Sequence, residues 1–187
     1  MTPKDLLARL IGALDQAGVP YMLTGSLASS IHGMPRASND FDIVIAPTAT
    51  QLRVLKSLLD ESQYYFDLDD ALNMLNRHRQ FNVIDLSSGW KIDFIFRKSR
   101  LFSLAEFDRR FRMEFEGLTL FVASAEDVVI AKLEWAKLGG SQRQIEDAAG
   151  IIKIRWNELD REYIQRWVED LAIQDQWRLA LAVAGFS

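Results

Sequence analysis

The segment Asp40–Ala46, DFDIVIA, constrains the fold more than any other part of the chain. Alternate residues of a β-strand point to opposite faces of the sheet, so Phe41 and Ile43 share a face that must be buried. Asp40 and Asp42 project together from the other face, with Cα atoms roughly 7 Å apart. The chain must therefore build a sheet with one apolar face and one face that carries neighbouring negative charges.

Helical and strand patterns alternate around this segment. A proline at the first turn and apolar residues at helical spacing predict a helix over about residues 3–17. The stretches VPYMLTG and SLASSIHGM predict a short buried strand and a short helix. A further helix is expected at about residues 49–60, followed by a polar and partly helical insert at residues 67–79.

Two strand patterns, FNVIDLS and WKIDFIF, flank a Ser-Gly turn and predict a β-hairpin. A short helix and one more strand, in FEGLTLFVA, follow, and from Ser124 the pattern is helical to the end. These elements predict an α+β protein with a small mixed β-sheet flanked by helices. We expect residues 1–123 to form this core and residues 124–187 to form a helical C-terminal region packed on it.

Composition excludes several classes of site. The 187 residues include no cysteine, which excludes disulfides, thiolate zinc sites and cysteine nucleophiles. The two histidines argue against a metal site built from several histidines. The net charge of −4 argues against binding nucleic acid through overall charge. No apolar run approaches the length of a membrane span and the N-terminus has no signal-peptide core, so we expect a cytoplasmic protein that does not bind a membrane.

The pair Asp40 and Asp42 predicts a metal site. Two carboxylates that lie this close repel each other unless a positive charge sits between them. Magnesium binds through one or two protein carboxylates together with phosphate oxygens. The strand WKIDFIF supplies a third acid, Asp93, inside an apolar run where an unpaired charge is costly. If the two strands are neighbours, the three acids form one cluster; the alternative is that Asp93 pairs with Lys91.

Gly25 and Ser26 stand between a strand and a helix, where unpaired backbone N–H groups attract anions. Glycine allows close approach of a phosphate, and the serine hydroxyl adds a hydrogen bond. In the following loop Arg36 can clamp a phosphate and Ser38 can contact a nucleotide. The alternatives are a tight turn with a helix cap, a surface arginine and a turn serine.

These motifs resemble those of the nucleotidyltransferase superfamily that includes DNA polymerase β. The resemblance rests on Gly25 and Ser26, on the sequence DFDI that begins at Asp40, and on Asp93 in its apolar strand. The stretch HGMPRASNDFDIVI is similar to the bacterial subgroup of AbiEii-type toxins and their uncharacterised relatives. The resemblance covers about residues 19–152.

The stretch VVIAKLEWAKLGGSQRQIEDAAGII resembles the helical lysine motif of that subgroup. The motif's lysine corresponds to Lys132, its arginine to Arg143 and its late acid to Asp147. The resemblance implies that Lys132 reaches the triphosphate; alternatively, it is a surface lysine whose stem lies along the helix. Arg143 and Asp147 stand four residues apart, so they could also form an ion pair along one helix.

The resemblance implies an enzyme that moves a nucleoside monophosphate from an NTP to a hydroxyl group, with Mg²⁺ or Mn²⁺ as cofactor. Asp40, Asp42 and Asp93 would hold the metal, and Asp93 would act as the base. Gly25, Ser26, Arg36, Ser38 and Lys132 would bind the nucleotide. The acceptor would be RNA, a protein or a small molecule, and a role in a toxin–antitoxin system would add a cognate antitoxin as partner. The alternative is a non-catalytic module of the same fold that binds a nucleotide or a protein.

Overall fold

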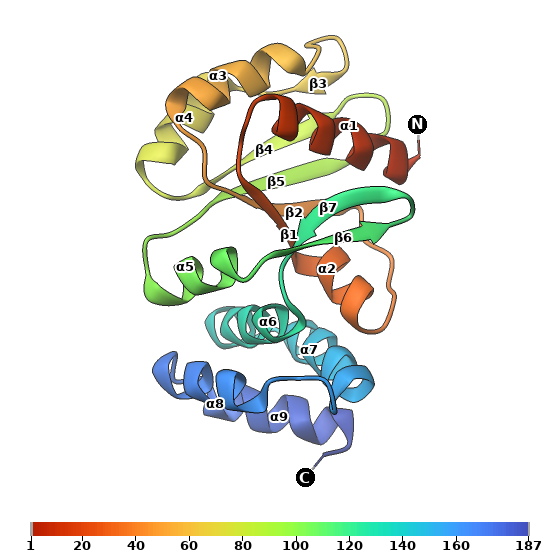
Figure 1. Ribbon diagram of the computed structural model, residues 1–187, viewed down its shortest axis with the longest axis vertical. Helices are drawn as coiled ribbons and strands as arrows, with labels where there is room; N and C mark the ends of the chain where they lie inside the picture. Colours follow the sequence, from red (N-terminus) through yellow and green to blue (C-terminus); the bar gives the residue numbers. More distant parts are fainter. Residues whose placement is uncertain (1, 187) are drawn as a thin grey trace. The chain divides into compact units, whose positions relative to one another are not determined.

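The computed structural model describes residues 2–186, which divide into two compact units. Of the described residues, 2–23 and 39–122 form the first unit, and 24–38 and 123–186 form the second. The second unit begins one residue before the predicted helical region, at residue 123. It also contains residues 24–38, which the sequence analysis assigned to the core. Figure 1 shows the course of the chain through both units.

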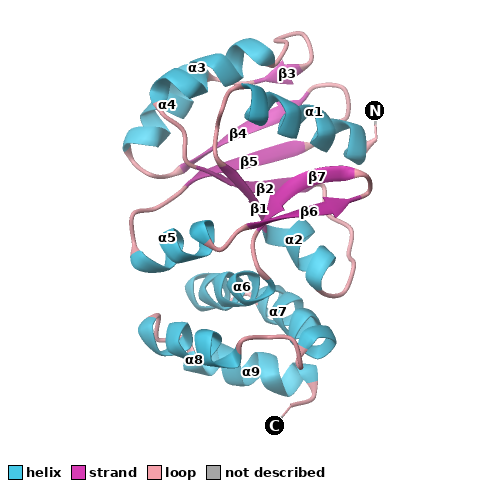
Figure 2. Ribbon diagram, in the orientation of Figure 1, coloured by secondary structure: helices cyan, strands magenta, loops and turns pink. Residues whose placement is uncertain are grey.

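A mixed β-sheet forms the centre of the first unit (Figure 2). In residues 2–186 its strands follow the order β3-β4-β5-β2-β1-β7-β6. Strand β2 is parallel to β5, and β1 is parallel to β7, whereas the outer pairs are antiparallel. The strands are β1 (Tyr21–Thr24), β2 (Asp40–Ile45), β3 (Tyr64–Tyr65), β4 (Gln80–Asp85), β5 (Lys91–Phe96), β6 (Phe111–Phe115) and β7 (Leu118–Val122).

The predicted α+β class and mixed sheet are confirmed. Helices α1, α3 and α4 lie over one face of the sheet in Figure 1. The side chains that this face buries are large and apolar, and Phe81 stacks on both Phe66 and Phe94. The helices of this unit are α1 (Pro3–Gln16), α3 (Ala49–Leu58), α4 (Leu68–Asn76) and α5 (Leu101–Asp108).

Capping side chains determine where two of these helices begin. Thr2 and Asp5 form a reciprocal capping box at the start of α1, and Thr48 and Gln51 form another at the start of α3. The predicted hairpin is also present: β4 and β5 pair in antiparallel register, and Asn82 lies opposite Asp93.

The second unit is helical. Its helices are α2 (Gly25–His32), α6 (Ala125–Gly139), α7 (Gln142–Arg155), α8 (Arg161–Asp170) and α9 (Gln174–Ala184). Helix α2 approaches α7 closely, because a Cβ atom added to Gly33 would lie 2.8 Å from the backbone nitrogen of Ile151. The imidazole of His32, at the end of α2, is hydrogen-bonded through Nε2 to the Ala123 carbonyl at 2.8 Å. These contacts explain why residues 24–38 belong to this unit.

A buried network fixes the start of α6. The hydroxyl of Ser124 donates to the Asp127 carboxylate at 2.6 Å and accepts from the Asp127 backbone N–H. The hydroxyl of Tyr163, on α8, donates to the other Asp127 oxygen at 2.6 Å. Both oxygens of the fully buried Asp127 carboxylate are thereby bound, as the low-dielectric interior requires. Within residues 2–186, every helix is too short or too polar to cross a lipid bilayer.

Candidate active site

Asp40, Asp42 and Asp93 lie on one face of two neighbouring strands, and we call them the acidic face. Strands β2 and β5 pair in parallel with Asp42 directly opposite Asp93, so the two side chains project from the same side of the sheet. Asp40 stands two residues before Asp42 and shares that side. The opposite side of the same strands carries the buried Phe41, Ile43, Ile45, Ile92, Phe94 and Phe96.

Asp93 is the most buried member of the acidic face, with an exposed side-chain fraction of 10%. Its Oδ2 atom is 3.0 Å from Nζ of Lys91. Its Oδ1 atom is buried and accepts no hydrogen bond within the described part of the chain. The pairing with Lys91 is the alternative that the sequence left open, but it satisfies only one of the two carboxylate oxygens.

The acidic face fits a divalent cation by its donor chemistry. Carboxylate oxygens are the ligands that hard cations prefer, and a buried carboxylate oxygen that lacks a partner is one that a cation can satisfy. Asn82, opposite Asp93 on β4, adds an amide oxygen on the same side of the sheet. Across residues 2–186, however, no three histidine, aspartate or glutamate side chains converge into a ready metal site. The metal therefore stays a prediction.

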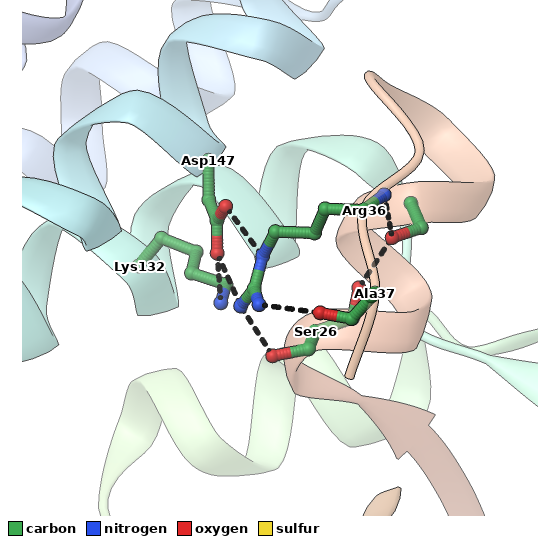
Figure 3. A network of polar contacts seen from close by, with 6 residues as sticks. Ser26, Arg36, Ala37, Lys132 and Asp147 are labelled. Carbon is green, nitrogen blue, oxygen red and sulfur yellow. Dashed lines mark hydrogen bonds and ion pairs between the residues drawn. The ribbon is translucent and has the colours of Figure 1, made fainter. Parts of the chain in front are cut away.

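The second unit holds a separate cluster, which we call the Asp147 network: Ser26, Arg36, Lys132 and Asp147 (Figure 3). Arg36 binds Asp147 with two parallel contacts, from Nε to Oδ1 at 2.9 Å and from Nη2 to Oδ2 at 3.0 Å. Nζ of Lys132 lies 2.8 Å from the same Oδ2 atom. Nη2 of Arg36 also donates to the hydroxyl of Ser26 at 2.5 Å.

Burial and charge make this network strong. The side chains of Lys132 and Asp147 are 6% and 8% exposed, and that of Arg36 is 23% exposed. Burial alone would raise the pKa of Asp147, but hydrogen bonds from Arg36 and Lys132 and their positive charges outweigh it and lower the pKa. Asp147 is therefore ionised at neutral pH. Two cations against one anion leave the network with one net positive charge.

The backbone at the start of α2 has an unusual conformation. Gly25 adopts a positive φ of 63°, a conformation in which residues with a Cβ atom are strained. Thr24, the residue that precedes the helix, makes no side-chain capping hydrogen bond. Ser38 lies half-buried in the loop between α2 and β2.

The sequence reasoning did not predict the partners of Asp147. Its carboxylate is bound by Arg36 and Lys132, so its ion pairs do not run along the helix to Arg143, which is exposed on α7. The missing signal was the long-range pairing between residues 36 and 147, which local helix rules cannot reveal. Lys132 is buried and ion-paired, so it is not the surface lysine of the alternative interpretation.

The fold is that of nucleotidyltransferase-like proteins. An antigenic nucleotidyltransferase-like protein from Paracoccidioides brasiliensis superposes with a TM-score of 0.58 at 15% identity, over 98% of this chain and 92% of that one. The structure of ANT(2″)-Ia in complex with adenylyl-2″-tobramycin superposes with a TM-score of 0.59 at 13% identity, over 95% of this chain and 99% of that one. No family model and no curated protein matches the sequence. At these identities the likeness establishes the fold.

Proposed function

We propose that the protein is a metal-dependent nucleotidyltransferase. The observation that carries the proposal is the register of β2 and β5, which sets Asp42 directly opposite Asp93 with Asp40 on the same side. Three acids so arranged on neighbouring strands offer hard oxygen ligands to a divalent cation, and a cation among them would offset the repulsion between their charges. The shared fold with nucleotidyltransferase-like proteins supports the same assignment.

In this proposal Asp40, Asp42 and Asp93 hold Mg²⁺ or Mn²⁺. When bound, such a cation supplies charge neutralisation for the phosphates of an NTP. Asp93 also takes the proton of the attacking hydroxyl group, as a carboxylate on the same side of the sheet as the other two acids can do. The acceptor oxygen then bonds to the α-phosphorus as the bond to the pyrophosphate oxygen breaks.

The residues at and near the start of α2 bind the triphosphate in this proposal. Gly25 allows close approach of phosphate oxygens, and Ser26 and Ser38 offer hydroxyl donors. Arg36 and Lys132 contribute positive charge, and Asp147 holds both cations in place. The net positive charge of the Asp147 network supports a polyanionic ligand.

We infer that the acceptor is a hydroxyl group of a small molecule. This choice is supported by ANT(2″)-Ia, whose structure contains adenylyl-2″-tobramycin and which matches this chain over nearly its full length. A protein or RNA acceptor and a cognate antitoxin, as the AbiEii-type resemblance implies, are the competing outcomes. Labelled NTPs incubated with aminoglycosides, RNA and cell lysate separate the three acceptors by the size of the labelled product.

Replacing Asp42 with asparagine tests the mechanism. The substitution preserves side-chain shape and removes one charge from the acidic face, so NTP turnover should fall by about 100-fold or more, as expected for loss of a metal ligand. Asp69→Asn, at an exposed position of α4, is the matched control and should keep wild-type turnover. Full activity of the Asp42 variant would rule out this mechanism.

A specific observation favours a second candidate, a nucleotide-binding module without catalysis. The ion pair between Lys91 and Asp93 already neutralises one of the three acids. Calorimetry with NTPs and Mg²⁺ that shows binding, together with no label transfer to any acceptor, would support this second function over the first.

A further inference from the structure

Lys91 belongs to the same side of the sheet as the acidic face. It is the first residue of β5 and pairs in register with Asp40 of β2, two residues before Asp93. Its Nζ atom lies 3.0 Å from Oδ2 of Asp93, and its side chain is 44% exposed. The positive charge of Lys91 thus lies beside Asp93, on the side of the sheet that carries the three acids.

The ion pair has a clear electrostatic role. The Asp93 carboxylate is nearly buried, and a buried carboxylate without a partner is strongly unfavourable. Lys91 provides the opposite charge, and its partial exposure lets the long side chain move into water with little loss of hydration. The buried Asp93 side chain is therefore fixed in place, whereas the Lys91 side chain can leave the ion pair and enter water.

A divalent cation on Asp93 would compete directly with this lysine. Both positive charges need the same carboxylate, and two cations at such short separation repel each other. The buried Oδ1 atom offers a cation one attachment point, whereas Oδ2 is occupied by Lys91. Lys91 therefore lowers the affinity of Asp93 for a metal ion, because the metal must either displace the lysine or bind close to its positive charge.

We propose that Lys91 is the resident counter-cation of the acidic face and that it weakens the binding of divalent cations by competing for Asp93. This inference rests on the proposed metal site at Asp40, Asp42 and Asp93. It makes Lys91 a residue that sets metal affinity, and the lysine itself takes no part in the chemical step. The competition would keep the metal site open until a nucleotide brings its own phosphate ligands to the cation.

Manganese titration of the full chain tests the proposal without an activity assay. Free Mn²⁺, followed by electron paramagnetic resonance, should bind Lys91→Gln about tenfold more tightly than wild type, a change that corresponds to 1.4 kcal/mol. Lys91→Arg retains the charge and should bind Mn²⁺ as wild type does. Lys56→Gln is the matched control, because it breaks an ion pair with Glu61 elsewhere in the same unit and should leave Mn²⁺ affinity unchanged.

Melting temperatures measured with and without Mn²⁺ cover the case in which the Lys91→Gln variant is less stable. A ligand that binds the folded state raises the melting temperature according to its affinity, so Mn²⁺ should stabilise this variant more than wild type. Equal or weaker Mn²⁺ binding by Lys91→Gln, with Mn²⁺ still binding wild type and lost in Asp42→Asn, would overturn the role of Lys91 alone. Absence of Mn²⁺ binding to wild type and to Lys91→Gln would overturn the proposed metal site itself.

Discussion

Asp147→Asn is the substitution that most directly probes the electrostatics of the second unit. The variant keeps the shape of the side chain and removes its charge. Lys132, whose side chain is 6% exposed, then loses the carboxylate that it binds at 2.8 Å. Arg36 loses its bidentate salt bridge to the same carboxylate. Removing one partner of a buried ion pair costs about 3–5 kcal/mol, because the remaining charge stays buried without compensation. Since Arg36 is partly exposed, we expect about 3 kcal/mol of lost unfolding free energy.

Urea denaturation followed by tryptophan fluorescence and circular dichroism measures this loss. The matched control is Asp175→Asn, which breaks an exposed ion pair with Arg178 and should cost about 0.5 kcal/mol or less. The double variant Asp147→Asn with Lys132→Met removes both buried charges and should recover part of the stability that the single variant loses. Equal costs for the Asp147 and Asp175 variants would refute the claim that the Asp147 network is a strong buried ion pair.

The remaining predictions concern acid stability and helix packing. The pKa of Asp147 is lowered in the folded state, so the ionised carboxylate stabilises the fold at pH values above the unfolded-state pKa of about 4. This stabilisation is lost as the pH falls through the folded-state pKa. The difference in unfolding free energy between wild type and Asp147→Asn should therefore shrink below about pH 4. Gly33→Ala places a Cβ atom 2.8 Å from the Ile151 nitrogen and should cost about 1–3 kcal/mol by thermal denaturation. Gly12→Ala, with no atom within 4 Å of the new Cβ in helix α1, should instead stabilise by about 0.5–1 kcal/mol.

The sheet was predictable where apolar and polar residues alternate strictly. Phe41 and Ile43 against Asp40 and Asp42 define the two faces of β2, and a turn between two such patterns predicts the β4–β5 hairpin. Strand β6 was missed because the sequence FRMEF is largely exposed at the sheet edge and has no buried face to impose a clear pattern. Strand β3 spans only two residues, too few to show any period.

The candidate site was predictable only in its local parts. The spacing of Asp40 and Asp42 and the apolar surroundings of Asp93 are visible in the sequence, and their shared face follows from the period of a strand. The partners of Asp147 were not predictable, because Arg36 lies 111 residues away and no sequence rule links the two positions. Tertiary packing of α2 against α7 decides that contact.

The central claim is that Asp40, Asp42 and Asp93 bind one divalent cation. Anomalous diffraction from a crystal soaked with Mn²⁺ and a non-hydrolysable NTP tests it most directly. The account predicts an anomalous peak within about 2.5 Å of carboxylate oxygens of both Asp42 and Asp93, with phosphate oxygens completing the coordination. Bound nucleotide without an anomalous peak at these carboxylates, and with Lys91 still paired to Asp93, would contradict it.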